Sequence, residues 1–328
     1  MINLFTVNSK MKNLKKIAFS IGLVICLLFI LEKVYDHFIY QNKNIKTNFI
    51  STEKVNAEIL FEGSCIPYQT INPSIIQNET GLKTYNLASN HSDLAENYLN
   101  IYLYLNNNPA PKIIFLFTGP ETFDENYNGF NSYRYSCFVD DRKVDEVINE
   151  LDPNYHKYLW FPFMKYAYYN SKITFPVLQG VKHYWSNKHL PYLIDGYDSP
   201  FKTIDKFNPL YKDLYKNQFE FQWSKNREKY LMKIIKLCQA SKIQLVLFDP
   251  PSLLLNIKKH QNNRKIIRKK INAIARKNNI SFWTFDSLKV CYQKEKFVSN
   301  YHLIESESIK FNKSLSKSIN RKIKYGFN

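Results

Sequence analysis

The sequence predicts an α/β fold built around a five-stranded parallel sheet. Five short apolar runs follow one another from about residue 58 onward, and amphipathic stretches with helical spacing lie between them. The runs are almost continuously apolar, which is typical of parallel strands that are buried on both faces. Alternation of such strands with helices is the pattern of an α/β domain. At 328 residues, the chain has room for one large domain or two small ones.

The predicted strands are "EILFE" (58–62), "KTYNLA" (83–88), "KIIFLFT" (112–118), "IQLVLFD" (243–249) and "SFWTFD" (281–286). Apolar residues at helical spacing predict a helix after Ser92-Asp93, with Glu96 completing a capping-box-like start. Further helices are predicted from about Ser224, around 264–277 and over 305–323. The basic outer face of the 264–277 helix is expected to be solvated.

The N-terminal segment predicts an uncleaved membrane signal anchor. Lysines precede "IAFSIGLVICLLFIL" (17–31), a run of about 15 apolar residues, compared with the ~20 that span a bilayer comfortably. No small-residue cleavage site follows. We therefore expect a cytoplasmic segment (1–16), a transmembrane helix (17–36), a polar stalk (37–56) and an extracytoplasmic domain (57–328). A buried core helix is the alternative, because the run is short for a span.

The stretch from about residue 120 to 223 breaks the α/β rhythm. It is dense in aromatic residues, for example in "HKYLWFPFMKYAYYN" (156–170), and in prolines. Such a length does not fit a plain loop within a compact domain, so we expect a mostly helical insertion. Its aromatic residues can form a core or a platform for a polysaccharide or a membrane interface.

The composition excludes several classes of function. The formal net charge is +18, but the lysines are scattered, and no zinc-finger spacing or RNP-like motif accompanies them. We therefore expect no nucleic-acid partner and favour an envelope protein near anionic lipid or polysaccharide. The five cysteines form no CxxC pair, which predicts neither a metal site nor a disulfide framework, although a single bridge stays open. No cofactor-binding motif is visible.

Gly63-Ser64 ends the first predicted strand and suggests a nucleophile. The carboxyl ends of parallel strands are where α/β folds expose catalytic groups. His302 follows the last strand and precedes the final helix, so it is the candidate base at the same edge. Cys65 is a rival nucleophile, but we expect its side chain to point away, because neighbouring residues at a strand end face opposite sides. Asp249 ends the fourth strand and is interpreted as loop closure beside the site.

The chain resembles the SGNH (GDSL-type) hydrolase superfamily, and in particular its membrane-anchored envelope branch, which includes proteins of alginate O-acetylation and of teichoic acid D-alanylation. The resemblance covers roughly residues 57–119 and 226–325. It depends on "ILFEGSCIPYQTINP", "GLKTYNLASNHSDLAENYLNIYLYL", "KIIFLFTGPETF", "IQLVLFDPP" and "FVSNYHL…SIKFNKSL".

The resemblance implies a flavodoxin-like three-layer sandwich. It also implies a serine esterase or O-acyltransferase that acts on acyl groups of a cell-envelope glycan and needs no cofactor. By position, Ser64 matches the family's nucleophile and an oxyanion-hole donor, and His302 matches its base.

Three positions depart from the family pattern. Ser299 stands where the family has an aspartate that orients the histidine, and such a loss can cost about 10⁴ in rate. Ala88 stands at the oxyanion-hole glycine, and Glu121 stands in the block that normally holds an asparagine donor, whose loss can cost about 10²–10³. Asn300, a backbone carbonyl or Glu121 could replace the aspartate, and Asn90 could supply the missing donor.

These departures keep a second hypothesis open. A catalytically degenerate relative would bind polysaccharide through the aromatic insertion or scaffold a membrane O-acyltransferase. A third hypothesis is an assembly factor that uses the fold only as a surface. In all three, we expect a single-pass protein of the cytoplasmic membrane with most of the chain outside.

Overall fold

The computed structural model describes residues 4–127, 129–169, 171–186, 196–197, 221–254, 258–299 and 301–325. The chain divides into two compact units. The first unit contains residues 1–48 and 132–189, and the second contains residues 49–131 and 190–328. The second unit holds the sheet and every candidate site residue.

The sheet of the second unit has five parallel strands in the order β2-β1-β3-β4-β5. The strands are β1 (Ile59–Glu62), β2 (Thr84–Asn86), β3 (Ile113–Phe117), β4 (Gln244–Asp249) and β5 (Ser281–Thr284). This order, 2-1-3-4-5, is that of flavodoxin-like doubly wound sheets. The predicted fold class is therefore confirmed, and each predicted strand is present.

The central strands are buried on both faces, as their continuous apolar runs indicate. β1 and β3 have no solvent-exposed residue, whereas the edge strand β5 is only half-buried. On one face, Phe61 and Phe115 stack with ring centroids 4.9 Å apart, and Phe248 packs edge-on against both rings. These rings fix the spacing of β1, β3 and β4, and so the edge where the site lies.

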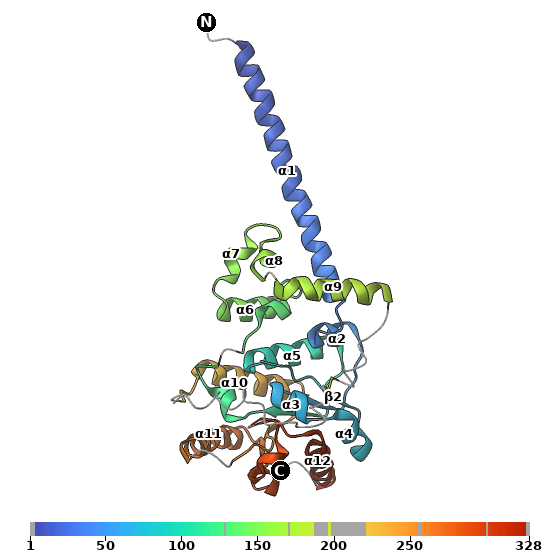
Figure 1. The fold of residues 1–328 in the computed structure, drawn as a ribbon, viewed down its shortest axis with the longest axis vertical. Helices are drawn as coiled ribbons and strands as arrows, with labels where there is room; N and C mark the ends of the chain where they lie inside the picture. The colour runs from blue at the N-terminus through green and yellow to red at the C-terminus, as the bar shows by residue number, and fades with distance from the viewer. Residues whose placement is uncertain are drawn as a thin grey trace. The chain divides into compact units, whose positions relative to one another are not determined.

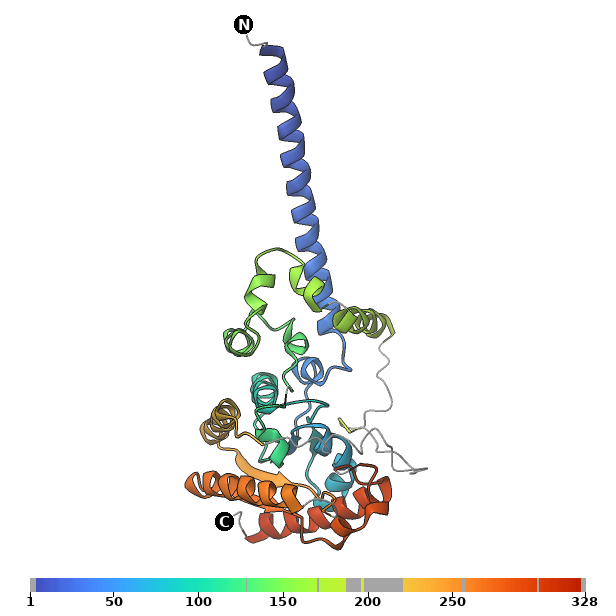
Figure 2. The same ribbon diagram turned by 60° about the vertical axis from the view of Figure 1, so that its left-hand side comes forward.

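Helices cover both faces of the sheet in the second unit (Figure 2). On the face that carries Phe61, the core includes residues of α3 (Cys65–Thr70), α4 (Pro73–Thr80) and α12 (Glu305–Tyr325). α5 (Leu94–Asn107) and α10 (Lys225–Ala240) pack against each other, and α10 contacts β4. α11 (Lys258–Lys277) packs along β5. Short 3₁₀ helices complete the unit: η1 (Pro120–Phe123), η4 (Lys289–Tyr292) and η5 (Lys294–Lys296).

The helix starts follow their capping residues. The Asp93 side chain accepts hydrogen bonds from Ala95 N and Glu96 N at the start of α5. Ser224 caps α10, and Asn72 caps α4, whose first residue is Pro73. Such caps satisfy backbone N–H groups that have no partner within the helix. The helix starts predicted near residues 92–93 and 224 are thus correct.

The first unit is helical. It contains α1 (Leu4–Tyr40), η2 (Ser132–Tyr135), α6 (Arg142–Leu151), α7 (Tyr155–Leu159), α8 (Met164–Tyr169) and α9 (Ser171–Ser186), with α2 (Lys46–Thr52) at its boundary (Figure 1). The insertion is thus mostly helical where the structure describes it. Its unit begins at residue 132 rather than at about 120, because η1 belongs to the second unit, where Phe123 stacks on Trp223. Residues 187–195 and 198–220 of the predicted insertion lie outside the described residues.

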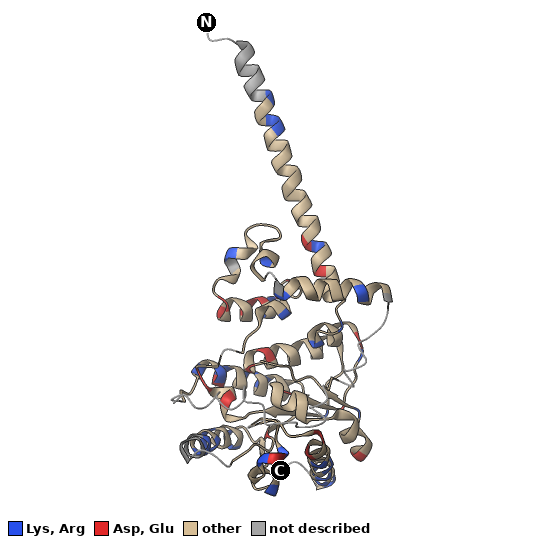
Figure 3. Ribbon diagram, viewed as in Figure 1, with Lys and Arg blue, Asp and Glu red and all other residues tan. Residues whose placement is uncertain are grey.

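α1 is long and apolar enough to cross a membrane by length and composition. Its segment Lys12–Tyr40 contains a window of mean hydropathy 2.4, none of which is buried. Figure 3 shows an uncharged stretch of α1 between charged residues near its two ends. α1 extends beyond the expected 17–36 at both ends.

The segment 37–56, expected to be a polar stalk, is folded instead. Asn42 and Asn48 are fully buried. Asn48 Nδ2 donates to Ile39 O at 2.6 Å, and Asn42 Nδ2 donates to Pro176 O at 2.8 Å. The amide groups therefore serve backbone carbonyls in the interior, a role that a polar, unpatterned sequence does not reveal.

Candidate active site

Ser64 lies at the carboxyl end of β1, directly after a turn that only glycine fits. Gly63 has φ +149°, and a Cβ atom there would lie 2.5 Å from Phe117 Cβ. Ser64 then occupies the position before α3 in an extended conformation, and its side chain makes no capping bond. The turn places Ser64 at the edge where the loops after all five parallel strands meet.

Hydrogen bonds between α3 and α12 join the two halves of the candidate site. Thr70 O, at the end of α3, accepts from Ser308 Oγ and Asn312 Nδ2, both at 2.7 Å. Asn72 N donates to Asn312 Oδ1 at 3.0 Å. Because α12 begins just after His302, these bonds hold the histidine near the Ser64 segment despite their separation in sequence.

His302 sits in a tight turn that fixes its ring. Val298 N donates to His302 O at 2.8 Å, and Phe297 and Leu303 form an antiparallel bridge. Ser299 Oγ lies 2.7 Å from His302 Nδ1. The serine that stands in the aspartate position is therefore the Nδ1 partner.

The other hydrogen bonds of Ser299 indicate whether its hydroxyl donates to His302 Nδ1 or accepts from it. Ser299 Oγ accepts hydrogen bonds from Tyr301 N at 3.3 Å and His302 N at 3.2 Å. A hydroxyl has two acceptor sites and one donor, and the backbone N–H groups use both acceptor sites. Its own proton is then directed to Nδ1, so this network assigns the neutral imidazole proton to Nε2.

The environment keeps His302 neutral. Burial lowers the pKa of His302 to about 4, and the Cys65 backbone raises it in part. The imidazole thus lies beside the Ser64-Cys65 segment. Among the described residues, neither Ser64 Oγ nor His302 Nε2 forms a hydrogen bond of standard length and angle, although both atoms are buried.

Cys65 is closer to the site than expected. The chain leaves the strand at Gly63, and Cys65 is the first residue of α3, so the alternation of a strand does not apply. The expectation that Cys65 points away is wrong, because the Ser64 hydroxyl and the charge of Glu121 both act on its thiol. The pKa of Cys65 is raised to about 11, mainly by burial and also by the charge of Glu121, while the Ser64 hydroxyl opposes this shift in part. The thiol stays protonated near neutral pH, whereas a reactive cysteine has a lowered pKa.

The predicted oxyanion and supporting residues are placed differently. Ala88 N already donates to Asn86 Oδ1 at 3.1 Å, so the structure gives this N–H another role. Asn90 is exposed in the loop after β2. Asn300 lies outside the described residues.

Glu121 does not replace the missing aspartate. It lies in η1, and its Oε1 atom is buried without a hydrogen-bond partner among the described residues. The pKa of Glu121 is raised to about 7, mainly by burial and also by the charge of Asp249, while Arg264 opposes this shift in part. Glu121 is therefore a partly protonated carboxyl group near the site, while Ser299 holds the histidine.

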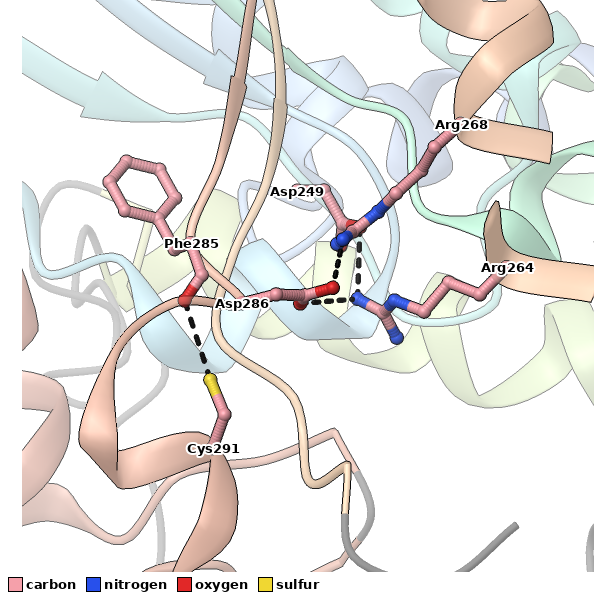
Figure 4. A network of polar contacts seen from close by, with 6 residues as sticks. All are labelled: Asp249, Arg264, Arg268, Phe285, Asp286 and Cys291. Carbon is pink, nitrogen blue, oxygen red and sulfur yellow. Dashed lines mark hydrogen bonds and ion pairs between the residues drawn. The ribbon is translucent and has the colours of Figure 1, made fainter. Parts of the chain in front are cut away.

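A network of two carboxylates and two arginines lies at the same edge (Figure 4). Arg264 Nη2 binds Asp249 Oδ2 at 2.9 Å and Asp286 Oδ1 at 3.4 Å. Arg268 binds both carboxylates as well. The basic face of α11, expected to be solvated, thus directs these two arginines inward. Asp249 is the centre of a buried ion network rather than a simple loop closure.

Two buried amide clusters, which the sequence analysis missed, hold the turn at Ser64. Glu62 Oε1 accepts from Gly63 N at 3.0 Å and from Asn97 Nδ2 at 2.7 Å. Asn86 Nδ2 donates to Pro67 O and Ile71 O, both at 2.9 Å. The available signal was a polar residue at the carboxyl end of a strand, Glu62 in "ILFE" and Asn86 in "TYN".

No metal centre accompanies these groups in the described part of the chain. No group of three or more His, Cys, Asp or Glu side chains there could hold a metal ion.

Comparisons with known proteins give a likeness in fold. No family model and no curated protein matches the sequence. A GDSL-like lipase from Bacteroides thetaiotaomicron is 9% identical, with a TM-score of 0.42 over 87% of this chain and 99% of that chain. A family two carbohydrate esterase from Clostridium thermocellum is 9% identical, with a TM-score of 0.32 over 83% of this chain and 65% of that chain. These solved neighbours are of esterase type.

Proposed function

We propose that the protein is an SGNH-like esterase or O-acyltransferase that acts on acyl groups of a cell-envelope glycan, with Ser64 as nucleophile and His302 as base. One observation carries the proposal. Ser64 Oγ and His302 Nε2 are two buried polar atoms that form no hydrogen bond of standard length and angle among the described residues, and the His302 ring lies beside the Cys65 backbone that follows Ser64. Buried polar atoms nearly always have partners in folded proteins, so such a pair is typical of a functional site.

The chemistry requires no cofactor. Ser64 Oγ attacks the acyl carbonyl carbon, and its proton passes to His302 Nε2. The tetrahedral intermediate collapses to an acyl-serine as the sugar oxygen leaves with the proton from Nε2. Water then releases the acyl group in an esterase, and a glycan hydroxyl accepts it in a transferase.

The first proton transfer needs Nε2 without a proton. The Ser299 network favours the opposite tautomer, so each turnover requires the Ser299 hydroxyl to give up its bond to Nδ1. The uncharged hydroxyl also stabilises the imidazolium less than a carboxylate would. The proposed enzyme is therefore slow.

The proposed location is the outer side of the cytoplasmic membrane. The apolar window of α1 supports a single span, and the lysines before it favour a cytoplasmic N-terminus. The span would hold the second unit near envelope glycans and near any membrane O-acyltransferase that it serves.

A second candidate function is a catalytically degenerate protein that binds polysaccharide or scaffolds a membrane O-acyltransferase. Two observations favour it: the hydroxyl at Ser299 and the engaged N–H of Ala88. The first weakens the base and the second weakens the oxyanion hole, and neither disturbs the fold.

Hydrolysis of p-nitrophenyl acetate by the purified full chain in detergent tests the proposal. We expect slow turnover that Ser64→Ala and His302→Ala reduce to the buffer rate, while Cys65→Ala leaves it near that of the wild type. Loss in Cys65→Ala alone would assign the nucleophile to the thiol. Equal rates in all four proteins would favour the non-catalytic candidate.

A further inference from the structure

The first unit exposes a group of large apolar side chains. Trp160 is 88% exposed, Trp185 78%, Phe175 64% and Leu178 62%. This aromatic surface also includes Leu159, Phe161, Met164 and Tyr184, which are all exposed. Exposure of so many large apolar side chains in one small unit is typical of an interaction site.

α9 is apolar on two sides. Ile173, Val177 and Gly180 face inward and are buried. Phe175, Leu178, Lys182 and Trp185 are all exposed and recur at intervals of three, four and three residues, so they form one stripe along the helix. A surface helix of a soluble unit has one apolar stripe, which packs on the core. The second stripe of α9 must therefore be covered by another apolar partner.

Close packing fixes α9 across the end of α1. A Cβ atom at Gly180 would lie 1.7 Å from Phe38 O, so only glycine allows this approach. Asn42 Nδ2 donates to Pro176 O, and the Tyr184 ring packs edge-on against Phe38. Within this unit α9 runs at a steep angle to α1 (Figure 1).

Ion pairs fix α8 to the same turns of α1. Lys165 Nζ lies 2.8 Å from Asp36 Oδ1 and 3.2 Å from Glu32 Oε1, with only 4% of its side chain exposed. Phe163 N donates to Glu32 Oε2 at 2.6 Å. The aromatic surface is thus held by residues 32–42, directly after the apolar run ends at Leu31.

We propose that the aromatic surface lies in the outer interface of the bilayer that α1 crosses, with α9 parallel to the membrane plane. This inference depends on the proposed membrane span of α1. A helix that crosses the end of a span at a steep angle lies in the plane of the interface, where Trp and Tyr are enriched and Lys reaches the headgroups. Lys172 and Lys182 are exposed on α9 and can reach lipid phosphates.

A groove between the two helices fits the same partner. It has a volume of about 620 Å³ and is lined by Phe29, Ile30, Val34, Phe38 and Tyr184, with Lys33 and His37 beside them. Apolar walls with the ammonium group of Lys33 beside them suit a lipid acyl chain and its phosphate. Phe175, Leu178 and Met164 offer no hydrogen bond to a polysaccharide, whereas they can be buried among lipid chains.

Fluorescence quenching by brominated lipid tests this placement. The chain has four tryptophans, two on the aromatic surface (Trp160 and Trp185) and two in the second unit (Trp223 and Trp283). The full chain is reconstituted into vesicles of phosphatidylcholine and phosphatidylglycerol, with or without dibromination near the headgroup. We expect strong quenching in the wild type, and loss of most of it in the Trp160→Phe, Trp185→Phe double variant.

A charge variant adds a control that does not depend on tryptophan. Phe175→Glu with Leu178→Glu should reduce the quenching, whereas Ile266→Glu, at an exposed position of the second unit, should leave it unchanged. Wild-type emission without quenching, in protein that resists carbonate extraction, would overturn this inference and leave the span intact. Carbonate extraction of the protein would overturn the span itself. Quenching or a spectral shift with soluble glycan but not with lipid would assign the surface to sugar binding.

Discussion

Ser299→Asp is expected to turn His302 into an efficient base. In the wild type, the Ser299 hydroxyl uses both acceptor sites on backbone N–H groups and gives its proton to Nδ1. A carboxylate accepts at several sites, so it can keep both backbone bonds and also accept the Nδ1 proton. The proton then leaves Nε2, which becomes free to take the proton of Ser64.

The expected gain is large. Loss of the orienting aspartate from a serine triad costs about 10⁴ in kcat, so its restoration should raise the hydrolysis rate by about 10²–10⁴. The pH profile should move as well. Burial lowers the pKa of His302 to about 4, so the wild-type rate should fall only as the pH drops through about 4, where the base becomes protonated. A neighbouring carboxylate raises the imidazole pKa, so the variant should lose activity at a higher pH, as the pH falls through about 6.5.

Two measurements check this prediction. The pH–rate profile of p-nitrophenyl acetate hydrolysis is compared for the wild type, Ser299→Asp and Ser299→Asn. The asparagine side chain has nearly the shape of the aspartate side chain but carries no charge. ¹⁵N NMR of histidine-labelled protein, with His302→Gln for assignment, should show the Nε2–H tautomer in the wild type and the Nδ1–H tautomer in Ser299→Asp. A wild-type Nδ1–H tautomer, or equal rates for the Asp and Asn variants in folded protein, would refute the reasoning.

Three further predictions concern stability. The pKa of Glu121 is raised to about 7 in the folded chain, so its contribution to stability is present below the unfolded pKa of 4.5 and is lost as the pH rises through 7. Urea unfolding should therefore show that the free energy of unfolding decreases less between pH 5 and pH 8 in Glu121→Gln than in the wild type, by a few kcal/mol at most. An equal decrease in the two proteins would contradict the raised pKa. Gly180→Ala should force α9 away from Phe38 O, at a cost of about 1–3 kcal/mol, and limited proteolysis should then cut the first unit faster, whereas unchanged cleavage would contradict the close approach. Asp249→Asn should cost about 3 kcal/mol in thermal or urea unfolding, because two largely buried arginines would then share only the carboxylate of Asp286. Adding Arg268→Met should recover part of this loss, whereas a neutral Asp249→Asn would show that the network is solvated.

The sheet, and the edge at which the candidate residues lie, could be predicted from the sequence. Strands buried on both faces need continuous apolar runs, and these runs are visible in the sequence. Once the strands are parallel, the loops after β1 and β5 reach the same edge of the sheet, which is why the sequence predicts that Ser64 and His302 lie close together.

Other features depend on geometry that a sequence pattern does not hold. The sequence predicts that Asn42 and Asn48 belong to a solvated stalk, yet their amide groups donate hydrogen bonds to buried carbonyl groups. Arg264 and Arg268 belong to a basic helix face, and only the tertiary structure directs them to Asp249. The direction of the Ser299 hydrogen bond depends on two backbone N–H groups, whose positions follow from the turn at 297–303.

The central claim, that Ser64 and His302 act as nucleophile and base, is tested most directly by mapping the adduct of a fluorophosphonate probe. We expect mass spectrometry of the full chain to find one phosphonylated peptide, with the label on Ser64. Labelling should be absent in Ser64→Ala, slower in His302→Ala, retained in Cys65→Ala and faster in Ser299→Asp. An unlabelled wild type, under conditions that label a reference serine esterase completely, would contradict the account, and so would a label that stays in Ser64→Ala.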